Sequence, residues 1–96
     1  KDGKGVAGLG DMSMFSFHAT KVFHSVEGGA ITFNGKEELY SQLKRWKDFG
    51  IYGLDFTDIT GGNAKMNEFS AAMGLCNLRH IDESIKKRKA AVLRYR

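Results

Sequence analysis

The clearest strand patterns in the sequence are MSMFSF at residues 12–17 and AITF at residues 30–33. In the first, methionine and phenylalanine alternate with serine, a period of two that predicts a strand with one apolar face. The second combines β-branched and aromatic residues after Gly28-Gly29 and ends at the turn signal Asn34-Gly35. A glycine-rich loop over residues 1–11 precedes both. We therefore expect loop and strands over residues 1–33.

Helical periodicity follows this region. A helix is expected over about residues 36–49, with Gly50 as the residue that ends it. Its apolar stripe is formed by Leu39, Leu43 and Trp46. Residues 50–63 contain turn residues without a sustained period and are expected to form a loop.

The last third of the chain, about residues 67–96, predicts two further helices. The first is expected from Asn67 to about His80, and its apolar stripe contains Phe69, Met73 and Cys76. The second is expected to start at Asp82, whose carboxylate could cap it. Two short strands make only a marginal sheet. The order of elements therefore predicts an α/β segment that is incomplete as a fold on its own.

Composition excludes several classes of protein. The 96 residues are 42% hydrophobic and 27% charged, which is ordinary for a globular protein and argues against disorder. No apolar run is long enough to span a membrane, so we expect no membrane partner. A single cysteine forms neither an internal disulfide nor a zinc site. We therefore expect a reducing, cytoplasmic location and no metal.

The net charge of +4 is concentrated at the C-terminal end. Residues 79–96 contain seven basic and two acidic side chains, a local charge of +5. Such a helix could follow a phosphate backbone, but a solvated helix face is the commoner explanation. We therefore expect no nucleic-acid partner and keep a basic nucleic-acid-binding module as an alternative.

Two familiar motifs are present without their required context. Gly3, Gly5 and Gly8 match G-x-G-x-x-G, but a dinucleotide site needs this pattern after a strand, and here it precedes one. Ser16 and His18 suggest a hydrolase, but the Gly-x-Ser-x-Gly elbow is missing. Neither motif supports its usual function here.

Lys21 allows two interpretations. It follows a predicted strand and is flanked by Thr20, Val22 and Phe23. Desolvation at the end of a strand would lower its pKa and favour a nucleophilic amine that condenses with an aldehyde. Alternatively, its stem packs and its ammonium reaches water. From the residues alone, the second interpretation is favoured.

Three separated motifs, in order, resemble the DegT/DnrJ/EryC1/StrS family of sugar aminotransferases, which depend on pyridoxal phosphate. They are SFHATK at residues 16–21, EGG at 27–29, and GNAKMNE at 62–68 running into AAMGL at 71–75. The likeness extends over nearly the whole chain. It implies that residues 1–96 are part of the large domain of a fold-type-I aminotransferase, which has a mostly parallel sheet and works as a homodimer.

The resemblance also implies residue roles. Lys21 matches the Schiff-base lysine and Ser16 a serine that binds the cofactor phosphate. Asn63 matches an asparagine that reaches the phosphate in the neighbouring subunit. The implied reaction moves an amino group, usually from glutamate, to a nucleotide-linked keto-sugar. Family members with histidine at the lysine position act as dehydratases, so Lys21 implies amino transfer.

Complete members of the family are several times longer than this chain. The aspartate that faces the pyridine nitrogen is expected upstream of residue 1, and the C-terminal domain is also absent from these 96 residues. We therefore expect the segment alone to be inactive as an enzyme. The alternative is a non-catalytic fragment that keeps only surfaces for folding or self-association.

Overall fold

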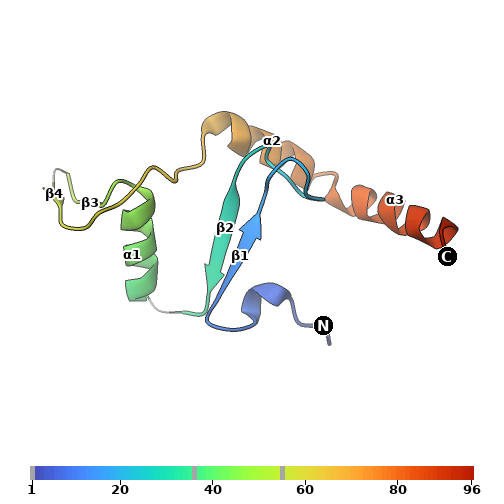
Figure 1. The fold of residues 1–96 in the computed structure, drawn as a ribbon, viewed down its shortest axis with the longest axis horizontal. Helices are drawn as coiled ribbons and strands as arrows, with labels where there is room; N and C mark the ends of the chain where they lie inside the picture. Colours follow the sequence, from blue (N-terminus) through green and yellow to red (C-terminus); the bar gives the residue numbers. More distant parts are fainter. Residues whose placement is uncertain (1, 36, 55) are drawn as a thin grey trace. The chain divides into compact units, whose positions relative to one another are not determined.

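The computed structural model describes residues 2–35, 37–54 and 56–96. These residues form two compact units, each made of two stretches of chain. The first contains residues 1–13 and 32–66, and the second contains residues 14–31 and 67–96. A 3₁₀ turn lies at Val6–Gly8. The elements labelled in Figure 1 are, in chain order, β1 at Met12–Ser16, β2 at Gly29–Phe33, α1 at Glu37–Lys47, β3 at Ile51–Tyr52, β4 at Phe56–Thr57, α2 at Glu68–Leu78 and α3 at Ile81–Arg94.

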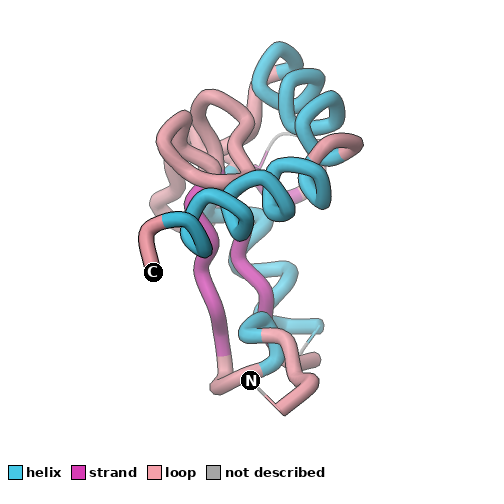
Figure 2. Tube along the Cα trace, turned by 90° about the vertical axis from the view of Figure 1, so that its right-hand side faces the viewer, coloured by secondary structure: helices cyan, strands magenta, loops and turns pink. Residues whose placement is uncertain are grey.

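The strands β1 and β2 pair in a two-stranded sheet and run side by side in opposite directions (Figures 1 and 2). The pairing is continued beyond one end by the Phe17 N–H, which donates to the Gly28 carbonyl at 2.8 Å. The predicted apolar face of β1 is wrong in one respect. Its less exposed side carries Ser13 and Phe15, whereas Met14 is 85% exposed.

Helix α1 is shorter than the predicted range of 36–49. The predicted first residue, Lys36, lies outside the described residues, as do Lys1 and Asp55 in the predicted loops. The helix ends at Lys47, and the chain then turns through Gly50, whose φ is +79° and whose N–H donates to the Arg45 carbonyl at 2.8 Å. The left-handed residue nearest the helix end is Phe49, with a φ of +58°, so the prediction that Gly50 ends the helix is wrong by one position.

The predicted loop 50–63 contains a short hairpin that the sequence pattern missed. Strands β3 and β4 pair antiparallel, with Ile51 opposite Thr57 and Tyr52 opposite Phe56. Strands of two residues are too short to show a period of two, which explains the omission. The guanidinium of Arg45 in α1 lies 5.3 Å from the centre of the Tyr52 ring and joins the helix to this hairpin.

Helices α2 and α3 occupy the predicted C-terminal region. The Asn67 side chain caps α2 by accepting a 2.9 Å hydrogen bond from the Ser70 N–H. The prediction that Asp82 caps α3 is wrong, because the helix starts at Ile81 and Asp82 lies in its first turn. There its carboxylate still interacts favourably with the positive end of the helix dipole.

Apolar side chains are largely uncovered in this segment. Among the described residues no hydrophobic side chain is fully buried, and the buried polar residues are Ser25 and Ser70. The predicted apolar stripe of α2 is also exposed, with Phe69 at 90%. The described elements therefore enclose no hydrophobic core. In the same ranges, no helix has both the length and the apolar character needed to cross a membrane.

Candidate functional site

The loop between β1 and β2, residues 17–28, carries Lys21 and is closed at its base by hydrogen bonds. Besides the pairing of Phe17 with Gly28, the Ser25 N–H donates to the Phe17 carbonyl at 2.9 Å. Ser25 is only 1% exposed, and its hydroxyl donates to the Glu27 carbonyl at 2.8 Å. A buried hydroxyl with a partner avoids the cost of desolvation, so Ser25 anchors the loop from inside.

Helix α2 holds this loop through one amide and one glycine. The Asn77 side chain donates a 2.9 Å hydrogen bond to the carbonyl of His24. One turn earlier, a Cβ atom at Gly74 would lie 3.3 Å from the Cβ of Ser25, so the small residue permits a close approach of the helix. The rings of Phe23 and Phe17 also pack in a T-shaped arrangement, with centroids 4.9 Å apart. Together these contacts fix the loop that follows Lys21.

Ser16 and Lys21 are connected through the backbone of His18. The His18 N–H donates to the Ser16 hydroxyl oxygen at 3.4 Å, and the Lys21 N–H donates to the His18 carbonyl at 2.9 Å. The second bond spans three residues and defines a β-turn around Ala19 and Thr20. The structure thus places these two predicted site residues on one hydrogen-bonded segment.

The Lys21 side chain is exposed among the described residues. Of the two interpretations of this lysine, the structure agrees with the one in which the ammonium reaches water. Desolvation of the amine is not provided by the part of the chain that the structure describes. The turn therefore supplies the position of Lys21 but not an apolar surrounding for it.

Asn63, the third predicted site residue, lies in the first compact unit. It forms an isolated antiparallel bridge with Asp48, just after α1. The neighbouring backbone is bound on both sides, because the Gly62 N–H donates to the Trp46 carbonyl at 2.8 Å and the Ala64 N–H donates to the Lys47 carbonyl at 2.9 Å. The Asn63 residue itself is exposed, so its amide is accessible.

Gly50 and Gly61 allow the segment before Asn63 to lie close to the end of α1. A Cβ atom at Gly61 would lie 2.2 Å from the backbone nitrogen of Gly50, and one at Gly50 would lie 2.0 Å from the Ile59 carbonyl oxygen. Such distances are far below van der Waals contact. The segment before Asn63 can therefore pack against the end of α1 only with glycine at these positions.

An ion pair that the sequence pattern did not indicate lies beside Asn63 in the chain. The Lys65 Nζ lies 2.9 Å from Asp48 Oδ1 and 4.4 Å from the centroid of the Phe49 ring. The hydrogen bond from Lys65 lowers the pKa of the Asp48 carboxyl, and the positive charges of Lys65, Lys47 and Lys44 act in the same direction. Asp48 and Lys65 lie 17 positions apart, so no local pattern indicated their contact.

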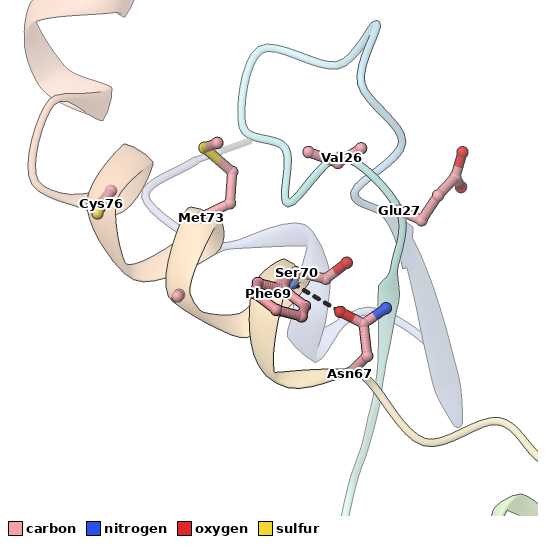
Figure 3. A pocket seen from close by; sticks show the side chains of 8 residues that line it. Val26, Glu27, Asn67, Phe69, Ser70, Met73 and Cys76 are labelled. Atoms are coloured by element: carbon pink, nitrogen blue, oxygen red, sulfur yellow. Dashed lines mark hydrogen bonds between the residues drawn. The ribbon is translucent and has the colours of Figure 1, made fainter.

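A separate shallow pocket of about 640 Å³ lies between the end of the loop and α2 (Figure 3). Neither Ser16 nor Lys21 lines it. Its lining is mostly apolar, and the polar groups that reach it include Glu27 and Ser70. The residues that line it are Val26, Glu27, Asn67, Phe69, Ser70, Ala72, Met73 and Cys76.

Comparison with known proteins gives consistent matches over the whole chain. The profile of the DegT/DnrJ/EryC1/StrS aminotransferase family matches residues 1–96. A dTDP-4-amino-4,6-dideoxy-D-glucose transaminase from Shigella dysenteriae is 46% identical over 87 residues, which are 91% of this chain and 23% of that protein.

Two solved aminotransferase structures also match nearly the whole length of this chain. The aminotransferase PseC of Helicobacter pylori, involved in the biosynthesis of pseudoaminic acid, superimposes with a TM-score of 0.89 at 34% identity, covering 99% of this chain and 26% of that one. The PLP-form of the putative sugar aminotransferase Spr1654 from Streptococcus pneumoniae has a TM-score of 0.84 at 29% identity, covering 97% and 26%. The chain thus spans about a quarter of the length of the proteins that it matches.

Proposed function

Because the chain belongs to the DegT/DnrJ/EryC1/StrS aminotransferase family, we propose that it contributes the cofactor lysine to a transfer of an amino group onto a nucleotide-linked keto-sugar. The predicted resemblance is confirmed, and so is the predicted class, an α/β segment of such an enzyme. The observation that carries the proposal is the hydrogen-bonded segment that joins Ser16 to Lys21. The homodimer, the glutamate donor and the cytoplasmic location stay predictions.

In this proposal Lys21 is the Schiff-base lysine. Its Nζ amine would hold pyridoxal phosphate through the aldehyde group of that cofactor. When bound, the cofactor supplies the electron sink for the carbanion chemistry. The Lys21 amine would also act as a general base that accepts a proton from the α-carbon of the amino donor. Because Lys21 is exposed, its amine is accessible both to the cofactor and to the amino donor.

The neutral donors of the segment suit a phosphate ester. The Ser16 oxygen accepts from the His18 N–H, so its own proton is free to be donated to a phosphate oxygen. The exposed amide of Asn63 would add a second neutral donor, from the neighbouring subunit. Hydrogen bonds from such groups to an ionised phosphate are stronger than those between neutral partners. The donor set therefore fits the cofactor.

Chemical trapping tests the assignment of Lys21. The chain is incubated with pyridoxal phosphate, reduced with borohydride, digested and mapped by mass spectrometry. We expect the pyridoxyl mass on Lys21 and its loss in Lys21→Arg, which keeps the positive charge. Lys86→Arg is the matched control, because Lys86 is exposed on α3 and should not affect labelling at Lys21. Labelling spread over the surface lysines and unchanged in Lys21→Arg would contradict the proposal.

A non-catalytic role in self-association is the second candidate, favoured by the uncovered apolar side chains. Leu54 is 97% exposed and Phe69 is 90% exposed. On this view the 96-residue chain alone is inactive and associates without binding cofactor in stoichiometric amount. Light scattering at several protein concentrations, combined with a pyridoxal phosphate titration, separates the two candidates. Association without labelling of Lys21 supports the second, and labelling of Lys21 supports the first.

A further inference from the structure

A second connection crosses the Lys21 loop through two side chains. The His18 Nδ1 lies 3.0 Å from the Glu27 Oε1, and the two residues are nine positions apart. They stand next to the paired backbones of Phe17 and Gly28 at the base of the loop. The two side chains therefore add a second link across the loop, next to the backbone hydrogen bond between Phe17 and Gly28.

This contact requires a proton on the Nδ1 of His18. An ionised carboxylate only accepts hydrogen bonds, so His18 Nδ1 must carry the proton that Glu27 accepts. In the neutral ring, Nε2 is then unprotonated, because the partner of one nitrogen sets the tautomer of the other. Within the described ranges, Nε2 has no hydrogen-bond partner in the structure. In the neutral ring, Glu27 thus holds one nitrogen and leaves the other available as an acceptor.

His18 is also the first residue of the turn that ends at Lys21. Its carbonyl accepts the Lys21 N–H, and its own N–H reaches the Ser16 hydroxyl oxygen. Rotation of the His18 backbone would break both bonds. A side-chain bond to Glu27 opposes this rotation, since Glu27 is itself tied to the buried Ser25 hydroxyl.

We infer that His18 and Glu27 are a pair of positioning residues for Lys21, with the carboxylate holding the imidazole across the loop and the histidine backbone setting the turn that presents the lysine. This inference rests on the proposed role of Lys21. The two side chains are 51% and 71% exposed, so solvent weakens the bond and its effect is modest. We expect loss of the pair to increase the equilibrium constant for opening of the turn about twofold to fivefold. The segment as a whole should stay folded.

Amide hydrogen exchange tests the pair without cofactor. In His18→Ala and in Glu27→Ala, the Lys21 N–H should exchange about two to five times faster than in the parent chain. The conservative variants His18→Asn and Glu27→Gln, which keep a donor and an acceptor in similar places, should restore slow exchange. His80→Ala is the matched control, because His80 is exposed and caps α3 without a side-chain hydrogen bond. Amides within α2 report whether a variant has lost the wider fold.

Two further measurements separate this inference from the assignment of Lys21. Nitrogen NMR should show His18 as the Nδ1–H tautomer in the parent chain and lose that preference in Glu27→Ala. Borohydride trapping at Lys21 should slow by a similar factor in both alanine variants. Unchanged Lys21 exchange in both alanine variants, with α2 intact, would overturn the positioning role. Trapping that is absent from Lys21 in the parent chain would overturn the proposed function, while the exchange result would still decide the role of the pair in the turn.

Discussion

The side-chain amide of Asn77 in α2 donates a 2.9 Å hydrogen bond to the backbone carbonyl of His24, three residues after Lys21. Asn77 is half-buried, and the two residues are 53 positions apart. This hydrogen bond joins a helix near the C-terminus to the loop that carries the proposed cofactor lysine. The order of that loop therefore depends on α2 as well as on the strands at its base.

Removal of the Asn77 amide should loosen the loop without melting α2. Asn77→Ala leaves the His24 carbonyl without its partner, which costs about 1 kcal/mol or somewhat more for a partly buried group. We expect faster amide exchange at Ser25 and Glu27 and a lower urea midpoint. Asn34→Ala is the control, because Asn34 also donates to a backbone carbonyl, that of Gly10, but in the other compact unit. Equal acceleration of loop exchange in both variants would contradict this assignment.

Gly74 should tolerate alanine and reject larger side chains. A methyl group there would meet the Ser25 Cβ at 3.3 Å, a contact that a small shift of the loop can relieve. Alanine also gains about 1 kcal/mol of helix propensity over glycine, which offsets the strain. Gly74→Val places two more methyl groups than alanine against the buried Ser25 and should destabilise the chain by about 1–3 kcal/mol. Urea unfolding of the two variants provides the measurement, and equal stabilities would refute the close packing of helix and loop.

Local signals were sufficient where neighbouring residues fix the structure. Asn67 followed by a helical pattern predicted the start of α2, and its side chain does cap the helix. Gly50 after the α1 stripe predicted a turn behind this helix, and its positive φ is what glycine allows, although α1 itself ends at Lys47. These features involve residues within one or two turns of each other. Their physical cause can therefore be read from a short window of sequence.

Contacts across long separations could not be derived in this way. Nothing near Ser25 indicates that it is buried against Gly74, and nothing near Asp48 indicates its pairing with Lys65. The apolar stripe of α2 that contains Phe69 shows a different limit of local patterns, because this stripe is exposed in the structure. Helical periodicity identifies an apolar face, but the described residues do not supply what covers it. The roles of Ser16, Lys21 and Asn63 came from the resemblance, not from periodicity.

The glycine at position 61 should be indispensable for the segment that presents Asn63. A Cβ atom there would lie 2.2 Å from the Gly50 nitrogen and 2.6 Å from the Phe49 carbonyl carbon, and backbone atoms cannot rotate away as a side chain can. We expect Gly61→Ala to cost about 1–3 kcal/mol through forced backbone shifts. Gly62→Ala is the adjacent control, because a Cβ atom at Gly62 has nothing within 4 Å. Circular dichroism and urea unfolding should show a loss for position 61 only, and a similar loss at both positions would argue against this packing.

The pairing of Asp48 with Lys65 should make the Asn63 segment sensitive to acid. The hydrogen bond from Lys65 lowers the pKa of Asp48 in the folded chain. A carboxyl group with a lowered folded pKa stabilises the fold above its unfolded pKa of about 4, and this contribution is lost as the pH falls through the folded value. The order of the segment should therefore decrease below about pH 4, and high salt should weaken the effect because the pair is exposed.

Titration of the Asp48 carboxyl carbon by NMR measures this effect directly. In Lys65→Met, which keeps an apolar stem but removes the ammonium, the Asp48 pKa should rise towards its ordinary value, although Lys47 and Lys44 still lower it slightly. The amide signals of Ala64 and Asn63 should then lose the part of their acid response that comes from the pair. Lys87→Met is the matched control, because it breaks the pair of Lys87 with Glu83 on α3 and raises the pKa of Glu83 instead. An Asp48 titration that is the same in Lys65→Met and in the parent chain would show that this ion pair does not hold the segment in solution.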